Sequence, residues 1–304
     1  MFARRKGATW QVFAPAKVNL TLRILGRRND GFHELETIMS PVALYDRLSF
    51  RPAAPGRRRW GFTCSAAPGL PSVPDGPENL VCQALHGLAE AAGVEPHGEF
   101  MLHKRIPAAA GLGGGSSDAA AALRLANRAW GLHLPDSRLR PLAESLGSDV
   151  PFFLSPGTAL CRGRGEQIDR LESAPALPAV IVKPTQGVST PAAFAALGLR
   201  PHDQTPPAAL AAPTVAALAA VQSADWMALR RWVRNALQTA AEGLCEQISR
   251  IRFACKRLDV VAHCMTGSGS AYFAICRTAR HAQRVAARLR AQNLGMVFAT
   301  ATCR

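Results

Sequence analysis

The sequence contains no apolar run of the about 18 residues that a membrane-spanning helix requires. Its first residues, MFARRKGATWQVFAPAK, are basic and lack the apolar core of a secretory signal. The eight cysteines are scattered without a C-x-x-C pair, so the spacing typical of metal sites is also absent. We therefore expect a cytoplasmic protein with reduced thiols, no membrane segment and no metal-ligand cluster.

Acidic residues are scarce: 21 Asp and Glu stand against 36 Lys and Arg, which gives a formal net charge of +15. A basic balance suggests an acidic partner, such as nucleic acid, anionic lipid or a phosphorylated small molecule. The charge is mostly dispersed arginine, however, so a solvated basic surface without a partner fits equally well. The basic run at 51–60 has Trp60 as its single aromatic residue, whereas stacking platforms for nucleic acid need more.

The length of 304 residues, with 48% apolar residues, suits two domains or one large domain with a substantial core. Strand-like and helix-like segments mix without a strict βαβ rhythm, which predicts an α+β fold. We expect strands at 10–25 (interrupted at Pro15), 33–39, 41–50, 60–65, 99–106, 158–161, 167–169, 179–183 and 296–301. We expect helices at 77–92, 119–132, 136–146, 214–221, 224–234, 238–254 and 279–291, a short helix after Ser189, and a loop at 200–213.

The most informative stretch is PAAAGLGGGSSD, residues 107–118, which places four glycines within five residues between a predicted strand and a predicted helix. Glycine lets backbone N–H groups converge on a bulky anion, and the helix N-terminus adds unpaired donors. Phosphate is the ligand that such a loop fits best. An ordinary capped loop, with Ser116 or Ser117 as the N-cap, remains the alternative.

Two common phosphate loops do not match this stretch. The pattern G-x-x-x-x-G-K-[ST] of the Walker A loop is absent. The dinucleotide pattern G-x-G-x-x-G would need a third glycine where Ser116 stands, and the preceding strand is polar rather than buried.

Several polar residues elsewhere allow both a structural and a functional interpretation. Lys17 lies on the polar face of the first predicted strand, where a solvated lysine is the simpler interpretation. Asn79 either bonds to a helix start or contacts a ligand. Asp149 stands between a helix stop and an apolar run, so it either caps a turn or points into a cleft. A lone His33 after a turn is more often a surface residue than a catalyst.

Five segments together resemble a known family: APAKVNLTLRI, GFHELETI, IPAAAGLGGGSSDAAAAL, LGSDVPFFL and MTGSGSAYFA. They occur in the order expected for the GHMP kinases, the group named for galactokinase, homoserine kinase, mevalonate kinase and phosphomevalonate kinase. The likeness runs from about Phe13 to Phe298. It implies a two-domain kinase with its active site in the interdomain cleft, in which residues 1–160 hold ATP and residues 161–304 complete the substrate site.

The combination most resembles the members that phosphorylate the 2-hydroxyl of 4-diphosphocytidyl-2-C-methyl-D-erythritol in the non-mevalonate isoprenoid pathway. The resemblance implies ATP and Mg²⁺, a small-molecule substrate, no nucleic acid or membrane partner, and a monomer or homodimer. A sister kinase acting on homoserine or mevalonate is the nearest alternative. A basic RNA-binding protein is an alternative from another class, and steeply salt-dependent RNA binding would favour it.

The resemblance also implies roles for individual residues. The catalytic pair would be Lys17 and Asp149. The nucleotide would contact Asn79, Lys104, Pro107, Ala108, Ala109, Ala110, Gly111, Leu112, Gly113, Gly114, Gly115, Ser116 and Ser117, with Ser116 or Ser117 as a candidate Mg²⁺ contact. The substrate site would be lined by Asn19, Phe32, His33, Thr190 and Phe194, with the Phe32 and Phe194 rings sandwiching the cytosine. Many relatives carry methionine and glycines where this sequence has Ala108 to Ala110.

Overall fold

A computed structural model describes residues 3–53, 60–155, 157–199 and 208–303. The chain forms two compact units that are not contiguous in sequence. The first contains Met1–Ala16, Leu44–Ala108 and Gly113–Pro156, and the second contains Lys17–Ala43, Ala109–Leu112 and Gly157–Arg304. Strands β2 (Thr9–Arg27) and β3 (His33–Arg51) contribute residues to both units. The functional division after residue 160 stays a prediction.

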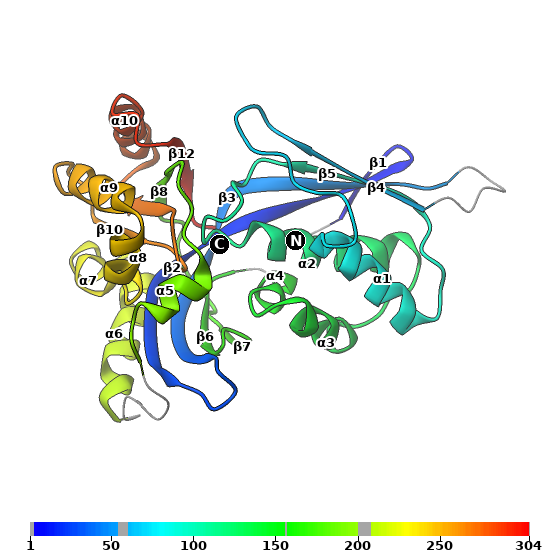
Figure 1. Cartoon of the computed structure of the whole chain (residues 1–304), viewed down its shortest axis with the longest axis horizontal. Coiled ribbons are helices and arrows are strands. Elements are labelled where there is room, and N and C mark those ends of the chain that lie inside the picture. Colours follow the sequence, from blue (N-terminus) through cyan, green and yellow to red (C-terminus); the bar gives the residue numbers. More distant parts are fainter. Residues whose placement is uncertain (1–2, 54–59, 156, 200–207, 304) are drawn as a thin grey trace. The chain divides into compact units, whose positions relative to one another are not determined.

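The described residues of the first unit form strands and the helices α1 to α4 (Figure 1). The short β1 (Arg4–Lys6) pairs with the start of β2, and the end of β3 pairs antiparallel with β5 (Gly98–Lys104). Strand β4 (Trp60–Ala66) runs parallel to β5. The helices α1 (Leu80–Ala92), α2 (Gly114–Ala129), α3 (Asp136–Leu146) and α4 (Val150–Leu154) pack against one another.

The core of the first unit follows from the alternation of its strands. In β5 every second residue is buried, which turns one face of the strand inward. Phe50 and Phe100 meet there with ring centroids 4.9 Å apart. Helix α2 brings a run of small buried residues, Ala119 to Ala122, together with Leu123 and Leu125. The small side chains allow α1 to pack closely against this helix.

The second unit holds the rest of the sheet that contains β2 and β3. Strand β6 (Ala159–Gly163) pairs antiparallel with the start of β3 and with β7 (Gln167–Arg170). Strand β9 (Arg234–Asn235) runs parallel to β2. A separate four-stranded antiparallel sheet has the order β10 (Ala262–Met265), β11 (Tyr272–Ile275), β8 (Pro178–Lys183) and β12 (Met296–Ala301).

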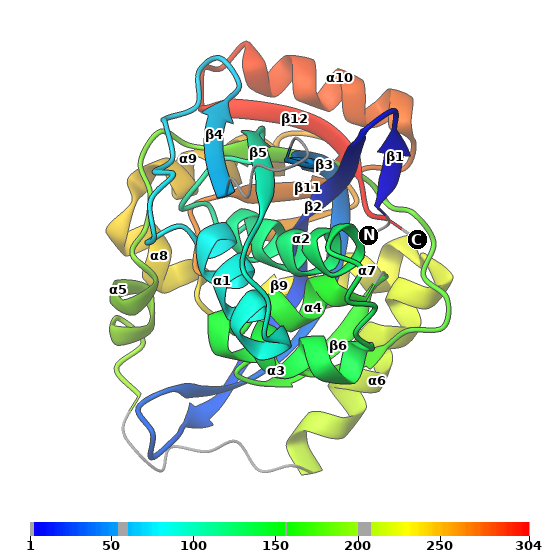
Figure 2. The same ribbon diagram turned by 90° about the vertical axis from the view of Figure 1, so that its right-hand side faces the viewer.

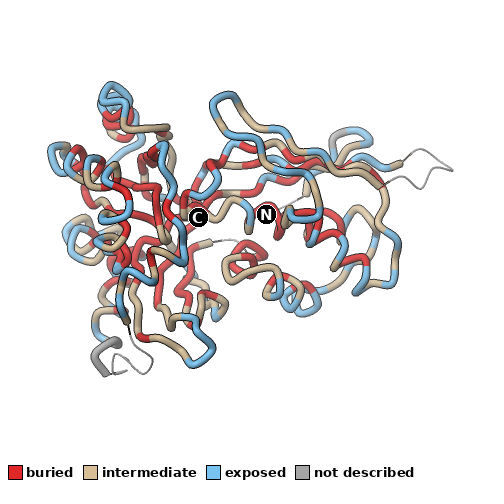
Figure 3. Tube along the Cα trace, in the orientation of Figure 1, coloured by how far each residue is buried: buried red, intermediate tan, exposed pale blue. Residues whose placement is uncertain are grey.

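Helices cover this second sheet. Helix α10 (Ala279–Arg290) packs against β8 and β12 and lies beside β12 in both views (Figures 1 and 2). The remaining helices of the unit are α5 (Thr190–Ala195), α6 (Ala208–Ser223), α7 (Trp226–Trp232), α8 (Gln238–Leu244) and α9 (Glu246–Lys256). Buried residues follow the strands and the inner faces of these helices, whereas the outer turns of α10 are exposed (Figure 3).

The predicted α+β class is confirmed, but three boundaries are wrong. Neither Pro15 nor Pro41 interrupts its strand, because a proline lacks only the N–H group and its carbonyl can still pair. The carbonyl of Pro41 indeed accepts the N–H of Cys303 at 2.7 Å. The predicted helix 238–254 is two helices, divided at Cys245, whose backbone is extended.

The predicted loop at 200–213 is also wrong in part, since α6 begins at Ala208. Residues 200–207 lie outside the described part of the chain, as do residues 54–59 of the basic run. Among the described residues, no helix is both long enough and apolar enough to cross a membrane.

Candidate active site

The glycine-rich stretch leads directly into α2. Gly113 is the N-cap of this helix and has a φ of 67°, in the left-handed region that favours glycine. Ser116 and Ser117 therefore lie in the first turn, and the alternative that one of them is the N-cap is wrong. The hydroxyl of Ser117 is buried and has no hydrogen-bond partner in the described part of the chain. The helix start thus offers backbone N–H groups and a hydroxyl oxygen at one place.

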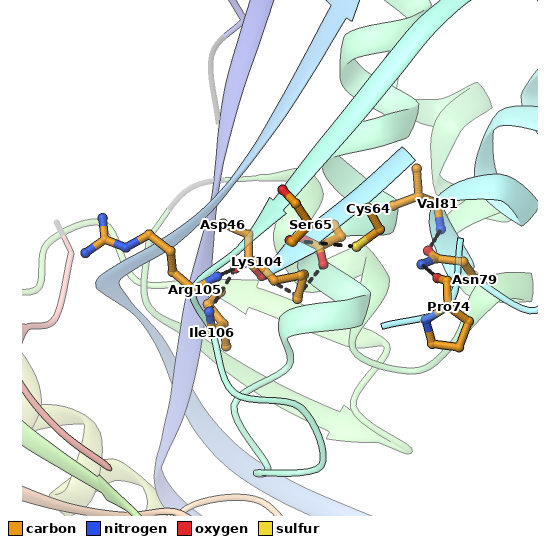
Figure 4. Close-up of polar contacts among 10 residues, drawn as sticks. Asp46, Cys64, Ser65, Pro74, Asn79, Val81, Lys104, Arg105 and Ile106 are labelled. Carbon is orange, nitrogen blue, oxygen red and sulfur yellow. Dashed lines mark hydrogen bonds and ion pairs between the residues drawn. The ribbon is translucent and has the colours of Figure 1, made fainter. Parts of the chain in front are cut away.

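Lys104, at the end of β5, lies beneath this helix start. Its ammonium donates to the carboxylates of Asp46 and Asp118, the latter at 2.5 Å, and all three side chains are buried (Figure 4 draws the Asp46 contact). A Cβ added to Gly114 would come within 3.3 Å of the Lys104 ammonium. Glycine at 114 therefore leaves room for a buried charge next to the loop.

Asp46 also holds the chain that enters the loop. Its second carboxylate oxygen accepts the backbone N–H groups of Arg105 and Ile106, at 2.5 and 2.8 Å (Figure 4). Since Asp118 lies in the first turns of α2, the three side chains join the residues before the loop to the helix after it. We call Asp46, Lys104 and Asp118 the buried triad.

Burial and neighbouring charges shift the pKa values of Lys104 and Asp118. Burial raises the pKa of the Asp118 carboxyl well above its usual range; Lys104 opposes this shift, and the Asp46 carboxylate adds to it. Burial by itself would lower the pKa of Lys104, but the charges of Asp118 and Asp46 outweigh it and raise that pKa. The lysine is therefore charged at neutral pH, and Asp118 binds a proton more readily than an exposed carboxyl does.

Asn79 is the N-cap of α1. Its side-chain oxygen accepts the N–H of Val81 at 2.9 Å, and its amide group donates to the carbonyl of Pro74 at 2.7 Å (Figure 4). The sequence left a helix-start role and a ligand role open. The structure shows the helix-start role, and a contact with a nucleotide stays a prediction.

In the second unit, Lys17 and Asn19 point to the same side of β2. The Lys17 ammonium donates to the side-chain oxygen of Asn19 at 2.7 Å, and the Asn19 amide donates to Thr37 on β3 at 2.8 Å. Lys17 is buried, so the interpretation as a solvated strand residue is wrong. Its alternating strand position gave no sign of this, because the side of a sheet that is covered depends on distant segments.

The covering segment is a second glycine loop, residues 266–269, between β10 and β11. Asn19 accepts the N–H of Gly267 at 2.9 Å, and its own N–H donates to the Thr266 hydroxyl at 2.9 Å. Gly111, with a φ of 71°, lies so close that an added Cβ would be 2.3 Å from the Thr266 carbonyl oxygen. Gly111 is thus required by backbone packing within this unit, whatever it contributes to phosphate binding.

The predicted substrate residues of the second unit form two ring contacts. His33 stacks on Phe194, with centroids 4.7 Å apart and planes at 27°. Phe32 instead lies under the guanidinium of Arg164, 4.7 Å from its centroid. The sequence predicted neither contact, and the expected sandwich of the cytosine between the Phe32 and Phe194 rings stays a prediction. Burial, followed by the charge of Arg27, lowers the pKa of His33, so its ring is neutral at pH 7.

Thr190 begins helix α5, and its hydroxyl lies 2.7 Å from the hydroxyl of Ser268 in the second glycine loop. This contact connects the start of the helix that carries Phe194 to the loop that covers Asn19. Asp149 belongs to the other unit, where it precedes α4. Its predicted partnership with Lys17 stays a prediction.

Comparison with known proteins identifies the family. The model of the GHMP kinases N terminal domain matches residues 79–157, and the model of the GHMP kinases C terminal domain matches residues 217–294. A 4-diphosphocytidyl-2-C-methyl-D-erythritol kinase of Pelotomaculum thermopropionicum is 41% identical over 91% of this chain and 92% of its own. The chain belongs to the GHMP kinases.

Solved structures agree with this assignment. A crystal structure of a 4-(cytidine 5'-diphospho)-2C-methyl-D-erythritol kinase matches this GHMP kinase with a TM-score of 0.78 and 36% identity, covering 97% of this chain and 99% of the other. A homoserine kinase from Cytophaga hutchinsonii matches with a TM-score of 0.73 at 20% identity, which shows a shared fold. The fold therefore extends across family members that are named for different alcohols.

Sequence reasoning missed three residues of this GHMP kinase: Asp46, Asp118 as a partner of Lys104, and Arg164. Two of them carried a detectable signal. Asp46 is a charged residue within a strand whose neighbours are mostly buried, and buried charges require partners. Asp118 closes the glycine-rich stretch itself. Arg164 stands in a G-R-G turn, and nothing in the sequence indicated that its side chain would reach Phe32.

Proposed function

We propose that this GHMP kinase transfers the γ-phosphoryl group of ATP to the 2-hydroxyl of 4-diphosphocytidyl-2-C-methyl-D-erythritol, a step of the non-mevalonate isoprenoid pathway. The observation that carries the proposal is the 41% identity, over nine tenths of both chains, to a curated relative named for this substrate. Two ring contacts support the proposal: His33 stacks on Phe194, and the neighbouring Phe32 lies under Arg164. Aromatic rings of this kind suit the binding of a flat base.

The phosphate groups of ATP would lie at the start of α2. Phosphoryl transfer proceeds through a loose transition state, so positioning and charge neutralisation provide most of the catalysis. The N–H groups at Gly114 and Gly115 belong to the first turn and have no partner within the helix. The positive end of the helix dipole adds to their attraction for an anion.

The Ser117 hydroxyl would hold Mg²⁺, which would neutralise part of the charge on the phosphate groups. The fit rests on Ser117, whose hydroxyl oxygen has no hydrogen-bond partner among the described residues, and oxygen is the ligand type that this ion requires. Asp149 would accept the proton of the 2-hydroxyl, and Lys17 would stabilise negative charge on the transferred group. Asn19 holds the Lys17 ammonium in place through the 2.7 Å hydrogen bond.

The proposal is tested by incubating the purified protein with ATP and Mg²⁺ and with each of three alcohols in turn. These are 4-diphosphocytidyl-2-C-methyl-D-erythritol, homoserine and mevalonate. We expect ADP release with the cytidyl substrate but not with homoserine or mevalonate. ³¹P NMR should then show a new phosphomonoester on the 2-oxygen of the cytidyl substrate. Faster turnover of homoserine or mevalonate would assign the enzyme to a sister activity and contradict the proposal.

A further inference from the structure

Two turns of the second unit meet at a cation and an aromatic ring. Phe32 follows the turn between β2 and β3, and Arg164 stands in the turn between β6 and β7. The Arg164 guanidinium lies 4.7 Å from the Phe32 ring centroid. Phe32 is 51% exposed, so the contact is made at the surface and leaves much of the ring accessible.

Each of the two side chains is positioned by its own turn. The carbonyl of Phe32 accepts the N–H of Arg28 at 2.8 Å, and its own N–H donates to Asp30 at 3.1 Å. On the other turn, the N–H of Arg164 donates to the Glu166 carboxylate at 2.6 Å. The contact between ring and guanidinium therefore joins two prearranged turns.

The side-chain donors of Arg164 are not used within the described part of the chain. A guanidinium has five N–H donors, and that of Arg164 donates to none of the described residues. Arg28 shows the contrast, because its guanidinium is bonded to Asp30 and Glu34. Arg27 adds a further positive charge near His33, whose pKa it helps to lower. Arg164 lies near the Asp30 carboxylate, whose pKa its charge helps to lower, but its side-chain donors bond to none of the described residues.

We propose that Arg164 is a specificity-determining residue that binds the diphosphate group of the cytidyl substrate while packing on one face of Phe32. This inference rests on the proposed function and names the part of the substrate that the residue recognises. Planar guanidinium groups suit phosphate oxygens, since two parallel N–H groups can bond to one phosphate. Stacking on the ring fixes the plane of the guanidinium and so limits the entropy lost on binding. The base would stack on the exposed part of the same ring or beside it.

The experiment compares binding of cytidine and of CDP to the whole enzyme by isothermal titration calorimetry. The variants are Arg164→Gln, which removes the charge, and Arg164→Lys, which keeps the charge but loses the planar group. Charge-assisted hydrogen bonds predict that Arg164→Gln weakens CDP binding by about 10- to 150-fold and cytidine binding by less than about 3-fold. The CDP affinity of Arg164→Lys should be intermediate between those of the wild type and Arg164→Gln.

Arg231→Gln serves as the matched control, because Arg231 is also a surface arginine that lies over an aromatic ring, that of Trp232. It should change neither affinity, and circular dichroism should show that all variants are folded. An equal loss of cytidine and CDP binding in Arg164→Gln would overturn the inference, since Arg164 would then act through the ring alone. Unchanged CDP binding would overturn it as well.

Failure of the proposed function gives a different result. In that case the wild-type enzyme would bind neither cytidine nor CDP, and would not phosphorylate the cytidyl substrate. If the variants keep their activity and the ratio of CDP affinity to cytidine affinity is the same in all of them, the role of Arg164 is overturned. The proposed function is not affected by that result.

Discussion

The Lys104 ammonium lies 2.5 Å from the Asp118 carboxylate, and both groups are buried below the start of α2. This contact was not expected, because the resemblance placed Lys104 beside the nucleotide. The buried triad holds the residues before the glycine-rich loop and the helix after it, so it fixes the two ends of the stretch that is predicted to bind phosphate. Its charges also lie close to that site, where their balance affects the affinity for an anion.

Removing the lysine should destabilise the enzyme strongly. Lys104→Met leaves two buried carboxylates without their cation, and such a loss costs about 3–5 kcal/mol in the free energy of unfolding. Urea denaturation followed by circular dichroism measures it. Lys256→Met, at an exposed lysine of α9, is the control and should change little. Adding Asp118→Asn to Lys104→Met should recover part of the loss; no recovery would argue against the triad as a unit.

Asp118 predicts a specific pH dependence of stability. Its pKa is raised in the folded state, so above the unfolded value of about 3.9 the folded protein holds a proton that the unfolded chain has released. Stability should therefore fall as pH rises from about 4 towards the folded pKa. Asp118→Asn removes this contribution, so its stability relative to the wild type should increase with pH. A constant difference between pH 4 and 8 would contradict the raised pKa.

Gly115 provides a test of the phosphate loop that spares the fold. An added Cβ would meet only the Leu80 side chain at 3.6 Å, an ordinary contact, whereas Gly113 has a positive φ that an L-residue adopts with strain. Gly115→Ala should leave the melting temperature within a few degrees and raise the KM for ATP. Unchanged ATP binding in this folded variant would argue that phosphate does not approach the first turn of α2.

The predicted catalytic pair is tested by a double-mutant cycle. Asp149→Asn should lower kcat at least about 10²-fold with little loss of substrate binding, because general base assistance acts in the transition state. Lys17→Ala should have a similar effect, and the double variant should lose less than the product of the two single losses. Full additivity in kcat would indicate that the two residues act separately.

Phe32→Ala tests the base-binding part of the site. Stacking of a base on an aromatic ring contributes about 1–3 kcal/mol, which corresponds to a rise of about 5- to 150-fold in KM for the cytidyl substrate. The KM for ATP should stay within about 2-fold. Equal activity on methylerythritol phosphate, which lacks the nucleotide, would show that the base contributes no binding energy.

Local patterns predicted the order of strands and helices well, because burial in this fold follows alternation and helical periodicity along the chain. Strand 60–65 and helix 136–146 are examples, as both lie within a residue or two of their observed bounds. The glycine stop at Gly93 is another, since its φ of 65° ends α1 in the left-handed region. The strand breaks predicted at Pro15 and Pro41 were wrong, because a strand tolerates the loss of a single backbone N–H donor.

Contacts between distant segments could not be predicted in the same way. Asp46 lies 58 positions before Lys104, and nothing local connects them. The family resemblance supplied the candidate site residues, but it gave no geometry for them. It therefore missed that Phe194 stacks on His33 and that Arg164 reaches Phe32. These pairings depend on how the second unit places the turn before β3, the turn between β6 and β7, and helix α5.

The contact between Gly111 and the second glycine loop has a consequence for the evolution of this enzyme. The two segments lie 155 positions apart, yet an added methyl group on Gly267 would come within 3.0 Å of the Gly111 backbone. Neither loop can gain bulk unless the other recedes. Across related sequences, positions 111 and 266–267 should covary as one unit, and a redesign of the nucleotide specificity would need to alter both loops together.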